Sequence, residues 1–165
     1  MTDASTCYQL SQGYLLIDTK KCSGCMSCMM ACTLAHEGRV DLTHARIQIK
    51  KHVFGTYPDD DIEQYVCKQC ADAPCVAACP TGAMQKDEET GIVWTDHDVC
   101  IGCKTCQVAC KDRRDIQVAG PRLRRVDTFE CGTYPEVAMF HLNLSCNHCE
   151  SPACVANCPT GAMYK

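Results

Sequence analysis

The chain has 165 residues, 18 of them cysteine, and a formal net charge of −4 at pH 7. The hydrophobic fraction of 46% includes those cysteines and only 6% of the residues are aromatic, so the apolar content is too small for two conventional hydrophobic cores. The negative charge argues against nucleic acid as a partner, and no apolar run approaches the roughly 20 residues of a membrane span.

The N-terminal sequence, MTDASTCYQLSQGYLLID, contains no signal for export. It has neither a basic region followed by an apolar stretch nor a twin-arginine pair, so we expect a cytoplasmic protein. In that reducing compartment cysteines bind metal more often than they form disulfides. A metal-binding protein is therefore favoured over a disulfide scaffold.

Short strands and short helices are predicted along the chain. Strands are expected, in order, at Tyr14–Ile17, Ile47–Ile49, Ala83–Gln85, Ile92–Thr95 and Phe140–Leu144. A turn at Glu88–Gly91 joins the third and fourth strands into a hairpin. Short helices are expected after Cys28, Cys75, Cys106 and Cys154. These elements predict a small α+β fold whose core is built around metal clusters.

Sixteen of the 18 cysteines fall into four motifs. The first and third motifs read C-x2-C-x2-C-x3-C, and the second and fourth read C-x2-C-x4-C-x3-C-P. In chain order the motifs consist of Cys22, Cys25, Cys28 and Cys32; Cys67, Cys70, Cys75 and Cys79; Cys100, Cys103, Cys106 and Cys110; and Cys146, Cys149, Cys154 and Cys158. Cys7 and Cys131 are left over and are expected to be free thiols, an extra-ligand role being the alternative.

This spacing is typical of [4Fe–4S] clusters. A tight loop with a thiolate at every third position can bring sulfur to three irons of a cubane, and in two-cluster ferredoxins the fourth cysteine of each motif ligates the other cluster. The proline after Cys79 and Cys158 fits a helix start. Structural zinc, the alternative, usually takes paired C-x2-C knuckles and has no use for a third cysteine three residues on. We therefore predict four [4Fe–4S] clusters.

The chain has the pattern of an internal duplication. Residues 22–86 align with 100–165 almost without gaps, the offset being 78 residues between the first and third motifs and 79 between the second and fourth. GTYP occurs at 55–58 and again at 132–135, and ACPTGAMQK at 78–86 corresponds to NCPTGAMYK at 157–165. Each copy carries the parts of one two-cluster module, with 34 and 35 residues inserted between its two motifs.

The four motifs together resemble the four-cluster iron–sulfur subunit of molybdenum and tungsten pterin oxidoreductases. In that family it is the electron-transfer partner in dimethyl-sulfoxide-reductase-type enzymes and in some aldehyde oxidoreductases. The resemblance covers about residues 13–165. It implies two bacterial-ferredoxin-like modules, in which motifs two and three (67–110) form a module nested within one built from motifs one and four (1–66 and 111–165).

The same resemblance implies which cysteines share a cluster. The four sets are Cys22, Cys25, Cys28 and Cys158; Cys146, Cys149, Cys154 and Cys32; Cys67, Cys70, Cys75 and Cys110; and Cys100, Cys103, Cys106 and Cys79. Two departures from the family pattern keep a tandem arrangement, 1–90 and 91–165, as the alternative. Lys111 follows Cys110 where the family has proline, and only four residues separate Cys149 from Cys154.

The resemblance implies an electron-transfer protein that is not an enzyme by itself. It would relay single electrons between a large catalytic subunit, a molybdenum or tungsten pterin enzyme that includes the aldehyde oxidoreductase type, and a further redox subunit or a copy of itself. A freely diffusing polyferredoxin is one alternative. An enzyme with an open-sided cluster is another, but it requires an iron without cysteine, and every motif here is complete.

The basic stretch from Lys111 to Arg125 allows three interpretations. Its cations could offset the negative charge of nearby clusters, dock an acidic partner surface, or form a solvated charged face. The six histidines show no catalytic spacing, so no catalytic residue is predicted.

Overall fold

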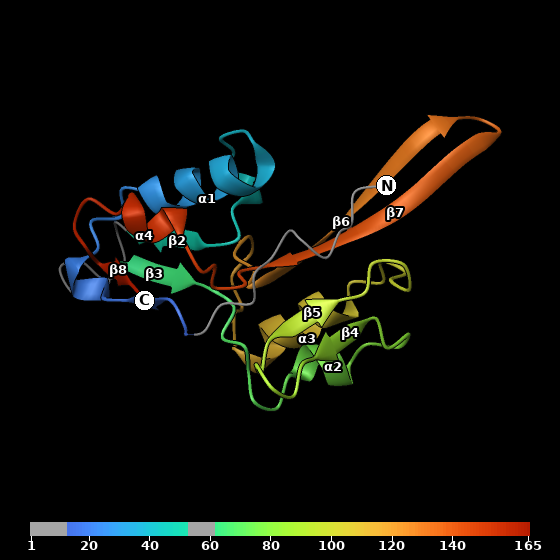
Figure 1. Cartoon of the computed structure of the whole chain (residues 1–165), viewed down its shortest axis with the longest axis horizontal. Helices are drawn as coiled ribbons and strands as arrows, with labels where there is room; N and C mark the ends of the chain where they lie inside the picture. Colours follow the sequence, from blue (N-terminus) through green and yellow to red (C-terminus); the bar gives the residue numbers. More distant parts are fainter. Residues whose placement is uncertain (1–12, 53–61) are drawn as a thin grey trace. The chain divides into compact units, whose positions relative to one another are not determined.

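The structure is a computed structural model that describes residues 13–52 and 62–165 (Figure 1). Cys7 and the GTYP segment at 55–58 lie outside the described residues. The chain separates into two compact units. Unit 1 comprises Met1–Val66 and Cys146–Lys165, and unit 2 comprises Cys67–Ser145.

Unit 1 joins the two ends of the described chain. Strand β1 (Leu16–Ile17) pairs antiparallel with β8 (Met163–Tyr164), and β2 (Gln48–Lys51) pairs antiparallel with β3 (Ile62–Tyr65). Helix α1 (Ser27–Glu37) packs against the short α4 (Ala153–Ala156). Two 3-10 turns, Thr19–Lys21 and Leu42–His44, complete the unit.

Unit 2 contains the second and third motifs and, like unit 1, has a pair of helices and antiparallel strand pairs. The short helix α2 (Pro74–Ala77) packs against α3 (Thr105–Arg113). Strands β4 (Met84–Lys86) and β5 (Val93–Thr95) form an antiparallel hairpin, as predicted. Its turn is closed by a hydrogen bond from the Gly91 N–H to the Asp87 carbonyl of 2.9 Å.

A long hairpin of β6 (Arg124–Thr133) and β7 (Glu136–Ser145) completes unit 2 (Figure 1). Only the first residues of β6 and the last of β7 are buried. The distal part is exposed, and there Phe129 and Phe140 stack on each other with ring centroids 5.4 Å apart. Residues 111–145, assigned from the sequence to the outer module, thus lie in the unit of the second and third motifs, because β6 packs against α3 and buries Val126 in the core of that unit.

The predicted strands coincide with observed ones, but the boundaries differ. Only the last two residues of Tyr14–Ile17 form β1, and Phe140–Leu144 is only the second half of β7. Strand β6 was not predicted because its sequence, RRVDTFECGT, shows no sustained apolar alternation. Pairing with β7 along ten residues stabilises it instead.

The predicted helices exist, but each begins just before the third cysteine of its motif. The expectation that proline after the fourth cysteine starts a helix is wrong. Pro80 and Pro159 follow the ends of α2 and α4 and lie in turns, where the N–H of Gly82 bonds to the Cys79 carbonyl and that of Gly161 to the Cys158 carbonyl. Proline is common there because it cannot continue a helix.

The core of unit 2 contains thiols as well as apolar side chains. Its buried cluster consists of Ala73, Cys75, Met84, Val93, Cys106 and Val126. Motif cysteines thus take the place that larger apolar residues hold in ordinary cores. Within residues 13–52 and 62–165, no helix has the length and apolar character to cross a membrane.

Candidate metal centres

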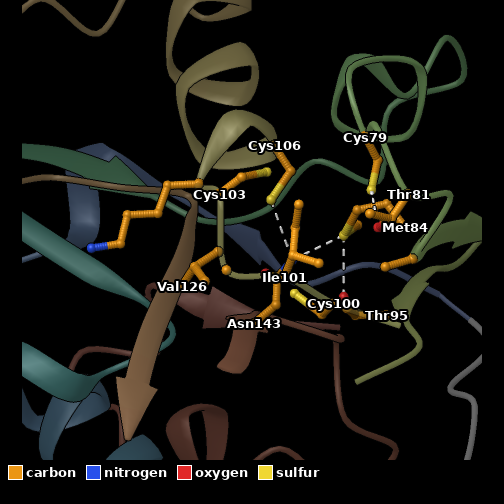
Figure 2. A pocket seen from close by; sticks show the side chains of 13 residues that line it. Cys79, Thr81, Met84, Thr95, Cys100, Ile101, Cys103, Cys106, Val126 and Asn143 are labelled. Carbon is orange, nitrogen blue, oxygen red and sulfur yellow. Dashed lines mark hydrogen bonds between the residues drawn. The ribbon is translucent and has the colours of Figure 1, made fainter. Parts of the chain in front are cut away.

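The first cavity of unit 2 is lined by four cysteines from two motifs (Figure 2). Cys100, Cys103 and Cys106 come from the third motif and Cys79 from the end of the second. Asn143 of β7 lies at the wall of this cavity and donates from Nδ2 to the sulfur of Cys106 at 3.3 Å. Such a donor stabilises a thiolate, because its hydrogen bond is stronger when the sulfur is charged.

The second cavity of unit 2 combines four cysteines with arginine. Its thiols belong to Cys67, Cys70, Cys75 and Cys110. Arg114 donates from Nη2 to the Cys70 sulfur at 2.9 Å. Arg113 and Arg124 also line this cavity, so part of the basic stretch lies beside thiols. Charge offset is therefore the interpretation of that stretch that the contacts favour.

The eight motif cysteines of unit 1 gather in two groups as well. Burial is the main cause that raises the pKa of Cys28 to about 11, and the nearby thiols of Cys22, Cys25 and Cys158 also raise it. The pKa of Cys146 is raised by burial and then by neighbouring thiols, which are those of Cys154, Cys32 and Cys149.

The pKa values of buried and exposed thiols are shifted in opposite directions. Burial raises the pKa of Cys110 to about 12, with further contributions from neighbouring thiols. The pKa of exposed Cys25 is lowered, chiefly by a hydrogen bond with the Ser27 side chain. Only thiolates bind iron, so insertion of a cluster must displace protons from the buried cysteines.

The donor sets fit clusters better than single ions. Across the described ranges, no three His, Cys, Asp or Glu side chains approach closely enough to hold one metal ion. Each of the two cavities of unit 2 is lined by four cysteines that come from two different motifs. Tetrahedral zinc draws its sulfur ligands to about 2.3 Å, whereas a cubane holds its thiolates apart with iron and sulfide. No disulfide joins any of the 17 cysteines that the structure describes.

Left-handed backbone shapes the loops of the first and third motifs. Gly24 and Met26 have φ of 68° and 63°, and Gly102 and Lys104 have φ of 65° and 63°. Alternating left-handed residues turn successive N–H groups toward one side, which makes a concave site for an anion. Each of these loops leads directly into a helix, α1 or α3.

Two further positioning residues were not singled out from the sequence. Buried Gln69 accepts a hydrogen bond from the N–H of Val93 at 2.8 Å, and buried His148 accepts one from the N–H of Leu15 at 2.9 Å. Both residues precede the second cysteine of their motif and have positive φ, 44° and 52°. Gln69 and His148 are 79 residues apart, which equals the offset between the second and fourth motifs. Their equivalent positions in the two motifs are the sequence signal by which both residues could have been predicted.

Of the other residues considered from sequence, His36 contacts a motif cysteine, its Nε2 lying 3.4 Å from the sulfur of Cys149. Cys131 is exposed on β6, opposite Ala138 in the ladder. His52 pairs with Glu63 at 3.1 Å, and His44 pairs with Asp41 at 2.6 Å.

Quartets of cysteine with ferredoxin spacing, in two small helix-and-strand units, define a ferredoxin-type iron–sulfur protein. Two family models match the chain, a 4Fe-4S dicluster domain over residues 60–115 and a 4Fe-4S binding domain over residues 19–38. With the relatives described next, they show that the chain belongs to the family of 4Fe-4S ferredoxin-type electron-transfer subunits.

The chain is similar to named electron-transfer proteins over most of its length. The electron transport protein HydN of Escherichia coli strain K12 is 36% identical over 154 residues, 91% of this chain and 85% of HydN. The thiosulfate reductase electron transfer subunit PhsB of Salmonella typhi is 31% identical over 93% of this chain and 74% of PhsB. The NADH-dependent phenylglyoxylate dehydrogenase subunit beta of Aromatoleum evansii is 35% identical over 90% of this chain, but the match spans only 29% of that protein.

Proposed function

We propose that this chain carries four [4Fe–4S] clusters and relays single electrons between a catalytic oxidoreductase subunit and a redox partner. The clusters supply one-electron redox chemistry, and the polypeptide supplies their spacing, potential and shielding from water. The observation that carries this proposal is the set of four-cysteine cavities in unit 2, matched by the grouped thiols of unit 1.

The cluster pairing that we propose is the nested one. It is supported by Cys110 lying with Cys67, Cys70 and Cys75, and by Cys79 lying with the third motif. Each pair of motifs then forms a two-cluster module, the outer ligands being Cys22, Cys25, Cys28 and Cys158, and Cys146, Cys149, Cys154 and Cys32.

We also propose that the two halves arose by duplication. Besides Gln69 and His148, a lysine is placed alike in both units: Lys86 donates to the Cys70 carbonyl at 3.2 Å, and Lys165 donates to the Cys149 carbonyl at 3.1 Å. These lysines are again 79 residues apart.

Iron content combined with paired substitutions tests both the number of clusters and the pairing. Anaerobically prepared protein should hold about 16 iron atoms per chain. Cys32→Ala and Cys149→Ala remove ligands of one cluster under nested pairing, so the double variant should lose no more than one cluster, about four irons. The matched double variant Cys32→Ala/Cys70→Ala should lose about eight. Tandem pairing predicts the reverse ranking, and a wild-type chain with zinc in place of iron would refute the clusters.

The partner that we propose is a large molybdenum or tungsten pterin enzyme. The family resemblance supports it, as do relatives whose names describe subunits of reductases and dehydrogenases. Affinity purification from native cells under anaerobic conditions, followed by metal analysis of the whole complex, should recover molybdenum or tungsten together with iron. Recovery of only this chain would instead support a freely diffusing polyferredoxin.

A further inference from the structure

Arg124, the first residue of β6, is a buried cation for which the described part of the chain supplies no carboxylate partner. Only 2% of its surface is exposed. Its Nη1 donates to Oδ1 of Asn143 at 3.1 Å, while Nε and Nη2 are buried without a hydrogen-bond partner. Within residues 13–52 and 62–165, no carboxylate forms an ion pair with it. A buried guanidinium in this state is strongly unfavourable unless an anion lies nearby.

The groups around Arg124 indicate where that anion belongs. Arg124 lines the cavity of Cys67, Cys70, Cys75 and Cys110. Its hydrogen-bond partner Asn143 lines the other cavity of unit 2 and donates to Cys106. Arg124 therefore lies within reach of both quartets.

The charge of Arg124 acts on cysteines of both cavities. Cys75 and Cys110 line one cavity and Cys106 the other, and Arg124 lies close enough to interact electrostatically with all three.

We propose that Arg124 is the shared counter-ion of the two clusters of unit 2 and raises the reduction potential of both. The inference rests on the proposed function, because it requires a cluster in each cavity. A cubane with four thiolates carries a charge of about −2 when oxidised and one more negative charge when reduced. A nearby cation stabilises the reduced form more, and burial makes this interaction stronger than it would be in water. The same charge lessens the repulsion between the two clusters while an electron passes from one to the other.

Arg113 provides a matched control. It lines the cavity of Cys67, Cys70, Cys75 and Cys110 but is paired with Asp72 at 3.0 Å, and its side chain is 59% exposed. Solvent and the carboxylate screen its charge. Arg113→Met removes the same formal charge beside the same cluster and should therefore shift potentials less than Arg124→Met.

The test is an anaerobic redox titration of the holoprotein followed by electron paramagnetic resonance, with iron content measured on every sample. Arg124→Met should lower the midpoint potentials of two clusters, by more than Arg113→Met lowers any. Arg124→Lys, which keeps the charge, should stay within the shift of the Arg113 variant. Unchanged potentials in Arg124→Met, with wild-type iron content, would overturn the inference while leaving the proposed function intact.

If Arg124→Met fails to retain its clusters, the iron content of Arg124→Lys distinguishes a requirement for positive charge from a structural role of the side chain. Retention of wild-type iron by the lysine variant supports a requirement for positive charge. Equal loss in both variants assigns Arg124 a structural role through its hydrogen bond to Asn143 and overturns the inference. Wild-type protein without iron in unit 2 would instead refute the proposed function itself.

Discussion

Gly102→Ala should destabilise the protein through one identifiable contact. Gly102 lies in the loop of the third motif with φ of +65°, and a Cβ placed on it would overlap the ring of His141 on β7. The distance from that Cβ to Cγ of His141 would be 2.5 Å, well inside van der Waals contact. The substitution therefore combines a backbone penalty with a steric one.

The two penalties can be separated within unit 2. Gly82 has φ of +69°, and a Cβ there would meet nothing within 4 Å, so Gly82→Ala measures the left-handed penalty alone, about 1–2 kcal/mol. Overpacking against His141 should add about 1–3 kcal/mol for Gly102→Ala. For a chain of this size the difference corresponds to roughly 2–12 °C in the unfolding midpoint.

Thermal unfolding of the holoprotein, followed by circular dichroism and by visible cluster absorbance, provides the assay. His141→Ala should restore most of the extra loss in the Gly102→Ala background. It should have little effect alone, because the half-buried ring forms an exposed hydrogen bond, with the Thr128 hydroxyl at 3.1 Å. Equal midpoints for Gly102→Ala and Gly82→Ala, or no rescue by His141→Ala, would refute the reasoning.

Three further predictions concern burial and protonation. His148→Ala should cost about 1–3 kcal/mol because it leaves the N–H of Leu15 unpaired, and His148→Gln, which copies the residue at position 69, should recover much of this in chemical unfolding. Ile47→Ala, at a side chain 1% exposed, should lower stability by about 2–5 kcal/mol, whereas Leu34→Ala, at a side chain 56% exposed, should have little effect. Cluster assembly on the cluster-free chain should release protons at pH 8 and strengthen up to about pH 12, because the raised pKa of Cys110 keeps its thiol protonated. An affinity that levels off near pH 9.0, the ordinary thiol value, would show that these thiols are exposed before assembly.

The chemistry of the sites could be predicted from the sequence because it depends on residue type and local spacing. A thiolate at every third position constrains a loop tightly enough that the helices at Cys28, Cys75, Cys106 and Cys154 could be located within a few residues. The hairpin of β4 and β5 could be predicted for the same reason, since its turn residues are adjacent in sequence.

What could not be predicted depends on contacts between distant segments. The burial of Arg124 is invisible in a run of basic residues, because it depends on contacts with Asn143 of β7 and Met84 of β4, which are distant in sequence. Gln69 and His148 act through backbone N–H groups 24 and 133 positions away. The turn at Pro80 was misread because proline fits both the start of a helix and the residues after its end, and sequence alone does not decide between them.

The free edges of the β6–β7 ribbon have a practical consequence for handling the protein. In the described part of the chain this sheet has two strands only, so both rims present backbone donors and acceptors next to apolar side chains such as Val137 and Met139. Ribbons of this kind template the addition of further strands, and overexpression of the chain by itself should favour precipitation into inclusion bodies. Replacing one outward apolar residue with lysine should improve the soluble yield without disturbing the cysteine cavities.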